Sequence, residues 1–204
     1  MIGFLRSLFK PKVATVPYRG VKHSLGTMVD AVQGPRGATS PLIRLVPEQV
    51  VLRIHPKDYL SQVLALRYWC NTHLHYTRDP VNVEWIRDPQ ALIEEMVANA
   101  EAAGAPRAFT DRQKAALVAR DPRAICLCDC DEFSVLLAAL CLQVGAPADF
   151  VTVGFGQKPI PHSHVFVRVA PKGNRIHVVV DPVAGSKEAW MLSNVGDYEV
   201  KELG

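Results

Sequence analysis

The stretch CDEFSVLLAALCLQVGAP constrains the fold more than any other, because its apolar residues recur at helical spacing. Those residues are Phe133, Leu136, Leu137, Leu140, Cys141 and Val144. Asp129 and Glu132 stand three positions apart at the start of this run, as in a capping box. Gly145 and Pro147 provide a stop signal after it. A helix with so wide an apolar face is buried, so we expect a central helix that begins at Cys130 and packs against the rest of the chain.

Two further helices and a connector are predicted before this central helix. Lys57–His73 carries apolar residues at helical spacing. The next helix opens at Pro89, with Asp88 as its cap. Residues 101–125 are polar and are predicted to be a connector or an insertion, with one short helix near Asp111–Ala119.

Three strand-like runs rich in Val and Phe follow the central helix: Ala148–Gly154, Ser163–Ala170 and Arg175–Asp181. Short segments with turn residues separate them, as in antiparallel hairpins. Helices that come first and an antiparallel sheet that comes last indicate the α+β class.

Residues 1–56 are predicted to form an extended, basic N-terminal arm before a domain that spans residues 57–204. Ten Pro and Gly residues punctuate positions 10–56, and we expect only a short strand there, at Gln49–Ile54. The arm holds eight Lys/Arg and two Asp/Glu, a net of +6, whereas the remainder holds fifteen and eighteen, a net of −3. This asymmetry favours a binding partner for the arm.

The N-terminal sequence MIGFLRSLFKPK is interpreted as a short amphipathic segment, because Arg6 interrupts its apolar run and no small-residue cleavage site follows. No apolar run in the sequence approaches the roughly 18–20 residues that a membrane-spanning helix needs, so we expect no membrane partner. The five cysteines are an odd number, which argues against a secreted disulfide framework. We therefore expect synthesis in a reducing compartment, the cytoplasm.

Three functions are possible for the cluster of Cys126, Cys128 and Cys130: a metal site, a disulfide or one reactive thiol. A metal site would add His162 or His164 to the cluster, but Cys-x-Cys-x-Cys is not the spacing of zinc knuckles. A disulfide between cysteines two positions apart would be strained. Cys130 is expected as the first residue of a helix, where free backbone N–H groups and the positive end of the macrodipole favour a thiolate. We favour the reactive thiol, with no metal and no other cofactor, and keep the other two as alternatives.

A nucleophilic cysteine needs a base, and PHSHVFVRVA supplies His162 and His164 at the start of a predicted strand. Alternation along that strand places His164 on one face with Phe166 and Arg168. The run RIHVVVDP ends at Asp181, a carboxylate at a strand end that can reach a histidine across a hairpin. Cysteine, histidine and aspartate together provide a nucleophile, a base and a group that fixes the tautomer of the base.

These motifs resemble the transglutaminase-like superfamily of papain-type cysteine enzymes. The stretches CDCDEFSVLLAALCLQVGAPADFVTVGF, HSHVFVRV and VVVDPVAG occur in the order of that family, and HYTRDPVNVEWIRDP resembles its phage and prophage members. The resemblance covers residues 57–185 and implies a papain-like core in which Cys130 is the nucleophile, His164 the base and Asp181 the orienting acid. His164 is preferred over His162 because it directly precedes the Val-Phe-Val strand. Cys128 departs from the pattern, since the family usually has glycine there.

The resemblance implies cysteine-dependent acyl transfer on peptide or carboxamide bonds, by a peptidase or amidase or else by a transamidase. The first donor of an oxyanion hole would be the backbone N–H of Cys130, and the second would come from Trp85, Tyr76 or Asn71. The loop HYTRDP, which holds Tyr76, could equally serve packing.

The phage resemblance also implies a different class of function. The protein would be a virion structural component, at the tail or the capsid–tail junction, whose fold is an interaction module with little or no activity. Residues 1–56 would then contact other phage proteins after the chain is incorporated into the virion. Nucleic acid bound by the arm is a third alternative, which is disfavoured because aromatic residues do not alternate with its charges.

Overall fold

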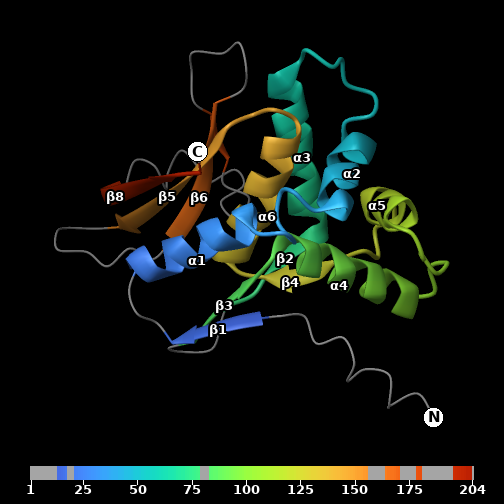
Figure 1. Cartoon of the computed structure of the whole chain (residues 1–204), viewed down its shortest axis with the longest axis horizontal. Helices are drawn as coiled ribbons and strands as arrows, with labels where there is room; N and C mark the ends of the chain where they lie inside the picture. The colour runs from blue at the N-terminus through green and yellow to red at the C-terminus, as the bar shows by residue number, and fades with distance from the viewer. Residues whose placement is uncertain are drawn as a thin grey trace.

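The computed structural model describes residues 13–17, 21–78, 83–155, 164–170, 178–180 and 195–203. In chain order the elements are β1 (Val13–Pro17), α1 (Val21–Gln33), α2 (Pro41–Val50), α3 (Tyr59–His73), β2 (Leu74–Tyr76), β3 (Val83–Arg87), α4 (Pro89–Ala102), α5 (Asp111–Arg120), β4 (Cys126–Cys128), α6 (Cys130–Gln143), β5 (Ala148–Phe155), β6 (His164–Val169), β7 (Val178–Val180) and β8 (Val195–Glu202). Helices dominate the chain up to Gln143 and strands dominate after it, which confirms the α+β class (Figure 1). Within the described ranges, no helix combines the length and the apolar character that crossing a bilayer requires.

The helix α6 lies at the centre of the fold, as predicted from its apolar spacing. Its N-cap Asp129 accepts hydrogen bonds from the backbone N–H groups of Asp131 and Glu132. All ten residues from Glu132 to Cys141 are buried. The helices α1, α2, α3 and α4 and the strands β5 and β6 contact α6, which lies in the middle of Figure 1. The predicted stop is also confirmed, because Gly145 adopts a φ of 73°, a conformation that glycine takes without strain.

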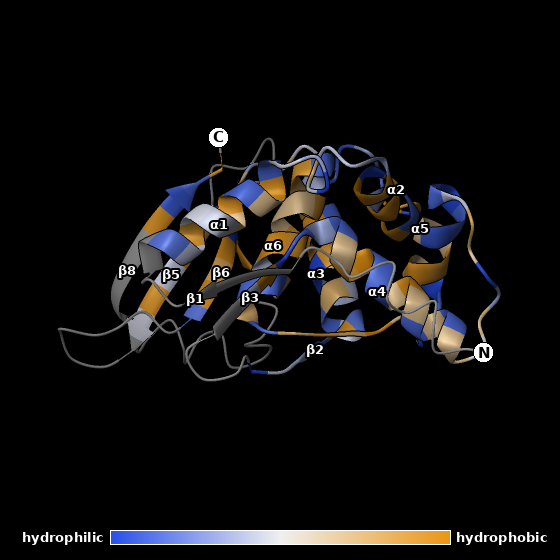
Figure 2. Cartoon of the chain, turned by 60° about the horizontal axis from the view of Figure 1, so that its bottom comes forward, coloured by the Kyte–Doolittle hydropathy of each residue, from blue (hydrophilic) through white to orange (hydrophobic). Residues whose placement is uncertain are grey.

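The C-terminal strands form one antiparallel sheet in the order β7-β6-β5-β8. The predicted strands Ala148–Gly154 and Ser163–Ala170 are confirmed as β5 and β6. Of the predicted strand Arg175–Asp181, residues 178–180 are confirmed as β7, and the others lie outside the described residues. The sequence analysis did not predict β8. In β6, Val165, Val167 and Val169 are buried in the main core with α6, and Phe166 packs with Val151 in a second, smaller cluster. The alternation predicted for β6 therefore separates a core face from an outer face. Figure 2 shows hydrophobic residues along β5, β6 and α6.

The prediction of an extended arm is wrong for residues 21–50, which form the helices α1 and α2. The strand expected at Gln49–Ile54 is instead the end of α2 and a turn. Apolar residues of both helices join the same core as α6: Leu25, Met28, Val32, Leu42, Ile43 and Val46. The described part of the arm therefore packs on the rest of the chain.

Proline and glycine start and join these helices, which is why the region looked irregular in sequence. Pro41 is the first residue of α2, where a missing N–H costs no helical hydrogen bond. Gly37, in the turn between α1 and α2, passes so close to α1 that a Cβ there would stand 2.0 Å from the carbonyl oxygen of Val32. A helix start and a tight turn use the same residues as an extended chain, so composition alone did not distinguish them.

The helices α3, α4 and α5 confirm the other predictions made before α6. Asp88 caps α4 as predicted, since its Oδ1 accepts a hydrogen bond from the Ala91 N–H at 2.8 Å. Two small sheets were not predicted: β1 pairs antiparallel with β3, and β2 pairs parallel with β4. The second of these places Tyr76 beside Cys128, at the strand that leads into α6.

Candidate functional site

The three clustered cysteines lie on two different elements. Cys126 and Cys128 belong to β4 and are fully buried, whereas Cys130 is the first residue of α6 and is partly exposed. All five cysteines of the chain are free thiols. Among the residues that the structure describes, no His, Cys, Asp and Glu side chains gather in a group that could hold a metal ion. Of the three residues, Cys130 is therefore the one that is not fully buried.

Cys130 lies against the start of β6, the strand that begins at His164. The backbone N–H of Val165 lies close enough to the sulfur of Cys130 to act on the pKa of that thiol, which it lowers. Ser134, one turn further along α6, donates from its Oγ to the carbonyl oxygen of Val165 at 3.3 Å. Because Val165 directly follows His164, the fold brings the predicted nucleophile and the predicted base to the same part of the molecule.

His164 is the first residue of β6 and is partly buried on the outer face of the strand. It pairs with Val153 of β5, and its ring centroid lies 6.4 Å from that of Phe166. Further along the same strand, Arg168 donates to Asp149 at 2.6 Å. The face that carries His164 thus points away from the main core, to which the alternate valines of β6 belong.

Two residues of the sequence prediction, Asp181 and the competing base His162, lie outside the described residues. Val180, the last described residue before Asp181, pairs with Val167 of β6. The strand that leads to Asp181 is therefore the direct neighbour of the strand that carries His164. The role of Asp181 as the orienting acid stays a prediction.

The surroundings of Cys130 raise the pKa of its thiol well above the ordinary value. Burial of the sulfur is the largest cause, and the carboxylates of Asp131 and Asp129 add to it, while the Val165 N–H acts in the opposite direction. The carboxylate oxygen Asp131 Oδ1 lies 3.6 Å from the sulfur. The helix N-terminus was expected to favour the thiolate, whereas desolvation and the two adjacent carboxylates act in the opposite direction and raise the pKa.

One of the three candidates for a second oxyanion donor, Tyr76, interacts with Cys130. Burial, and then the neighbouring Cys130, raise the pKa of the Tyr76 phenol. This side chain is half-exposed and stands on β2, next to the strand that leads into α6. Trp85 is half-exposed on β3, and Asn71 is exposed on α3. Tyr76 therefore combines a hydroxyl donor with proximity to the thiol.

The sequence analysis missed Arg87, a side chain that contacts both flanks of Cys130. Its guanidinium donates to Glu132 in the first turn of α6, at 2.7 Å from Nη2, and to the carbonyl oxygen of Leu127 in β4. It also pairs with Glu95 of α4. The side chains of Arg87 and Glu132 are only 13% and 2% exposed. In the sequence no local spacing connects Glu132 with Arg87, so the pair was not predicted.

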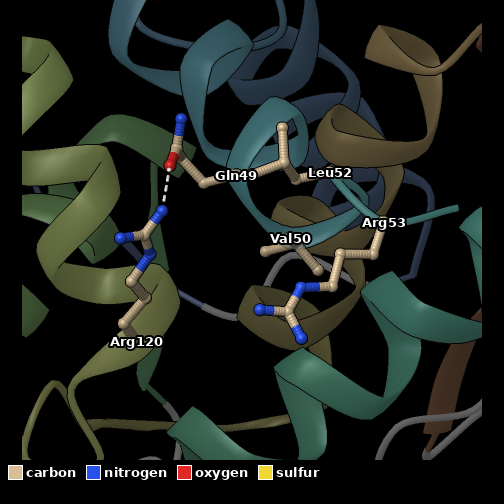
Figure 3. A pocket seen from close by; sticks show the side chains of 5 residues that line it. All are labelled: Gln49, Val50, Leu52, Arg53 and Arg120. Atoms are coloured by element: carbon tan, nitrogen blue, oxygen red, sulfur yellow. Dashed lines mark hydrogen bonds between the residues drawn. The ribbon is translucent and has the colours of Figure 1, made fainter.

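A separate pocket of about 440 Å³ lies between the end of α2 and α5 (Figure 3). Its lining residues are Gln49, Val50, Leu52, Arg53 and Arg120. Arg120 donates to Gln49 Oε1 at 3.1 Å, as the dashed line in Figure 3 marks. Arg53 and Arg120 stand at or just after the C-terminal ends of α2 and α5, where cations offset the negative end of the macrodipole. Helix electrostatics thus account for Arg120, which is the last residue of α5.

Comparisons of this chain with protein-family models, with curated proteins and with solved structures find no match. The resemblance to transglutaminase-like enzymes therefore depends on the sequence motifs. The geometry that bears on it is the contact between the start of α6, with Cys130, and the start of β6, with His164.

Proposed function

We propose that this protein catalyses cysteine-dependent acyl transfer on peptide or carboxamide bonds, with water as the usual acyl acceptor. One observation carries the proposal: the first turns of α6, which Cys130 opens, pack against the start of β6, where Ser134 donates to the carbonyl oxygen of Val165, the residue next to His164. Nucleophilic catalysis by cysteine needs a base within reach of the thiol, and in this proposal His164, the neighbour of Val165 in β6, is that base. In this proposal the fold is a papain-like core of the transglutaminase-like type, and Asp181 orients His164.

The reaction would begin when the thiol of Cys130 transfers its proton to His164 and the sulfur bonds to the substrate carbonyl carbon. The backbone N–H of Cys130 and the hydroxyl of Tyr76 would donate to the resulting oxyanion. The tetrahedral intermediate then breaks its C–N bond, and His164 gives the proton to the leaving amine. Water, deprotonated by His164, attacks the thioester and releases a carboxylate and the thiol. An amine in place of water would give transamidation.

Because the pKa of the Cys130 thiol is raised, the proposed mechanism requires His164 to accept its proton. A thiol that is buried beside two aspartates stays protonated at neutral pH unless a base accepts its proton. The reactive thiolate should therefore form only together with a protonated His164. This dependence makes His164 the residue whose removal tests the proposal most directly.

We expect the alkylation of Cys130 by iodoacetamide to depend on His164. Between about pH 5 and pH 7, wild-type Cys130 should react at least about tenfold faster than Cys130 in the His164→Ala variant, because that variant retains only an isolated thiol with a raised pKa. Mass spectrometry of the tryptic peptides gives the rate for each cysteine. Cys126 and Cys128 are internal controls, since burial raises the pKa of both thiols. Equal and slow alkylation of Cys130 in the two proteins, with ordinary thiol pH dependence, contradicts the proposal.

The raised pKa of Cys130 also favours a second candidate function, an interaction module with little or no activity. In a phage virion such a module would sit at the tail or at the capsid–tail junction, with residues 1–56 toward neighbouring subunits. Since α1 and α2 belong to the core, their exposed faces would make the contacts in that region. Under this alternative the Cys130→Ala variant assembles and functions like the wild type, whereas an enzyme loses its turnover.

A further inference from the structure

We infer that Arg87 is a positioning residue for Cys130, an inference that rests on the proposed function. Arg87 stands at the end of β3 and reaches the turn that joins β4 to α6. On the upstream side its Nη2 donates to the carbonyl oxygen of Leu127, and on the downstream side it donates to the carboxylate of Glu132. Cys130 lies between these two contacts, so one guanidinium holds both ends of the segment that presents the thiol.

The contacts of Arg87 define the orientation of its guanidinium in full. Nε and Nη2 donate to the two carboxylate oxygens of Glu132, which makes a bidentate pair. Nη1 donates to Glu95 of α4 and lies 3.5 Å from the sulfur of Cys126. The backbone N–H of Arg87 also donates to Glu132 Oε1 at 3.3 Å. Only a planar fork of donors makes these contacts together, and the single ammonium of a lysine cannot reproduce them.

Stability alone does not explain why this cluster of charges is buried. The side chains of Glu132, Arg87 and Glu95 are 2%, 13% and 33% exposed. The free energy lost when such charges leave water is about as large as the free energy gained from their mutual attraction. Apolar side chains of similar volume often stabilise a core equally well. An apolar cluster has no preferred hydrogen-bond direction, whereas this one fixes a backbone carbonyl and a helix turn relative to each other. The arrangement therefore favours a geometric role at the turn that carries Cys130.

Arg36 also contacts two carboxylates, and neither of them belongs to the turn that carries Cys130. Arg36 donates to Asp88 Oδ2 at 3.0 Å and to Glu94 Oε2 at 2.8 Å. Like Arg87, it binds one carboxylate of α4 and a second carboxylate at a helix start. The Arg36→Lys variant therefore makes the same arginine-to-lysine change as Arg87→Lys, but at contacts other than those that flank Cys130.

The test compares Arg87→Lys with Arg36→Lys in the full-length chain. The rate of Cys130 alkylation is measured as a function of pH, at a temperature where urea unfolding shows that both variants are folded. Misplacement of a reacting group by about 1 Å can reduce its rate by about 100-fold. We therefore expect Arg87→Lys to react at least about tenfold more slowly below pH 7, with a pH profile that approaches that of His164→Ala. Arg36→Lys should stay within about twofold of the wild type.

The outcomes separate this inference from the proposed function. If wild-type Cys130 depends on His164 and the folded Arg87→Lys variant keeps the wild-type rate and pH profile, the positioning role is overturned and the proposed function stands. If wild-type Cys130 shows no dependence on His164, the proposed function and the positioning role both fail. Should Arg87→Lys not fold, Glu132→Gln provides the same comparison, because it weakens the bidentate pair and keeps the shape of the side chain. The expected slowing of alkylation, and the result that contradicts it, are the same for this variant.

Discussion

Replacing Cys130 by alanine should abolish acyl transfer and leave the fold intact. Without the sulfur no thioester can form, so we expect turnover to fall at least about a thousandfold. The Asp129 cap and the Ser134–Val165 hydrogen bond do not involve the side chain of Cys130 and should persist. Turnover on a panel of peptides with carboxamide side chains measures the loss, through ammonia release for carboxamide bonds and through peptide fragments for peptide bonds. Intact mass after exposure to an activated ester shows whether an acyl group is still attached to the protein.

The matched control is Cys141→Ala, which removes a thiol from the same helix. Cys141 is fully buried, and burial raises the pKa of its thiol to about 12. This variant should lower the Tm through lost packing and retain turnover, because Cys141 lies in the core. Acyl transfer that survives in Cys130→Ala would identify a different nucleophile and reject the mechanism. A wild-type protein that never forms an acyl adduct would instead support the interaction module.

Deletion of residues 1–56 should prevent folding. An extended arm could be removed without harm, but α1 and α2 lie against α6. Six of their residues are buried in the core: Leu25, Met28, Val32, Leu42, Ile43 and Val46. Burial of each such side chain contributes about 1.5–3 kcal/mol, so the loss is on the order of 10 kcal/mol, which is comparable to the whole stability of a typical domain. Circular dichroism and urea unfolding of the truncated chain measure the effect.

Deletion of residues 1–12 is the control, because it leaves every described element in place. This shorter deletion should retain a cooperative unfolding transition and His164-dependent alkylation of Cys130. A chain without residues 1–56 that still unfolds cooperatively, near the wild-type midpoint, would show that α1 and α2 are dispensable. The packing of these two helices on α6 would then have to be revised.

The sequence by itself determined the elements that depend on interactions between near neighbours. Asp129 caps α6 by accepting from N–H groups two and three positions further on, and Asp88 caps α4 by accepting from the N–H group three positions further on. The apolar spacing after Cys130 required a buried helix, and alternation in β6 separated Val165 from His164. Such caps and periodicities act over a few residues, so they are visible in any chain segment read alone.

Only the tertiary structure decided how distant segments surround the candidate nucleophile. Arg87 and Glu132 are 45 positions apart, and no spacing rule connects them. The contact of Cys130 with Val165 likewise joins a helix to a strand that follows it at a distance. The direction of the Cys130 pKa shift depends on how much water these segments exclude and on which carboxylates remain near the sulfur. Burial and long-range pairing arise when the whole chain packs, which is why the sequence predicted the thiol and its helix but not the state of the thiol.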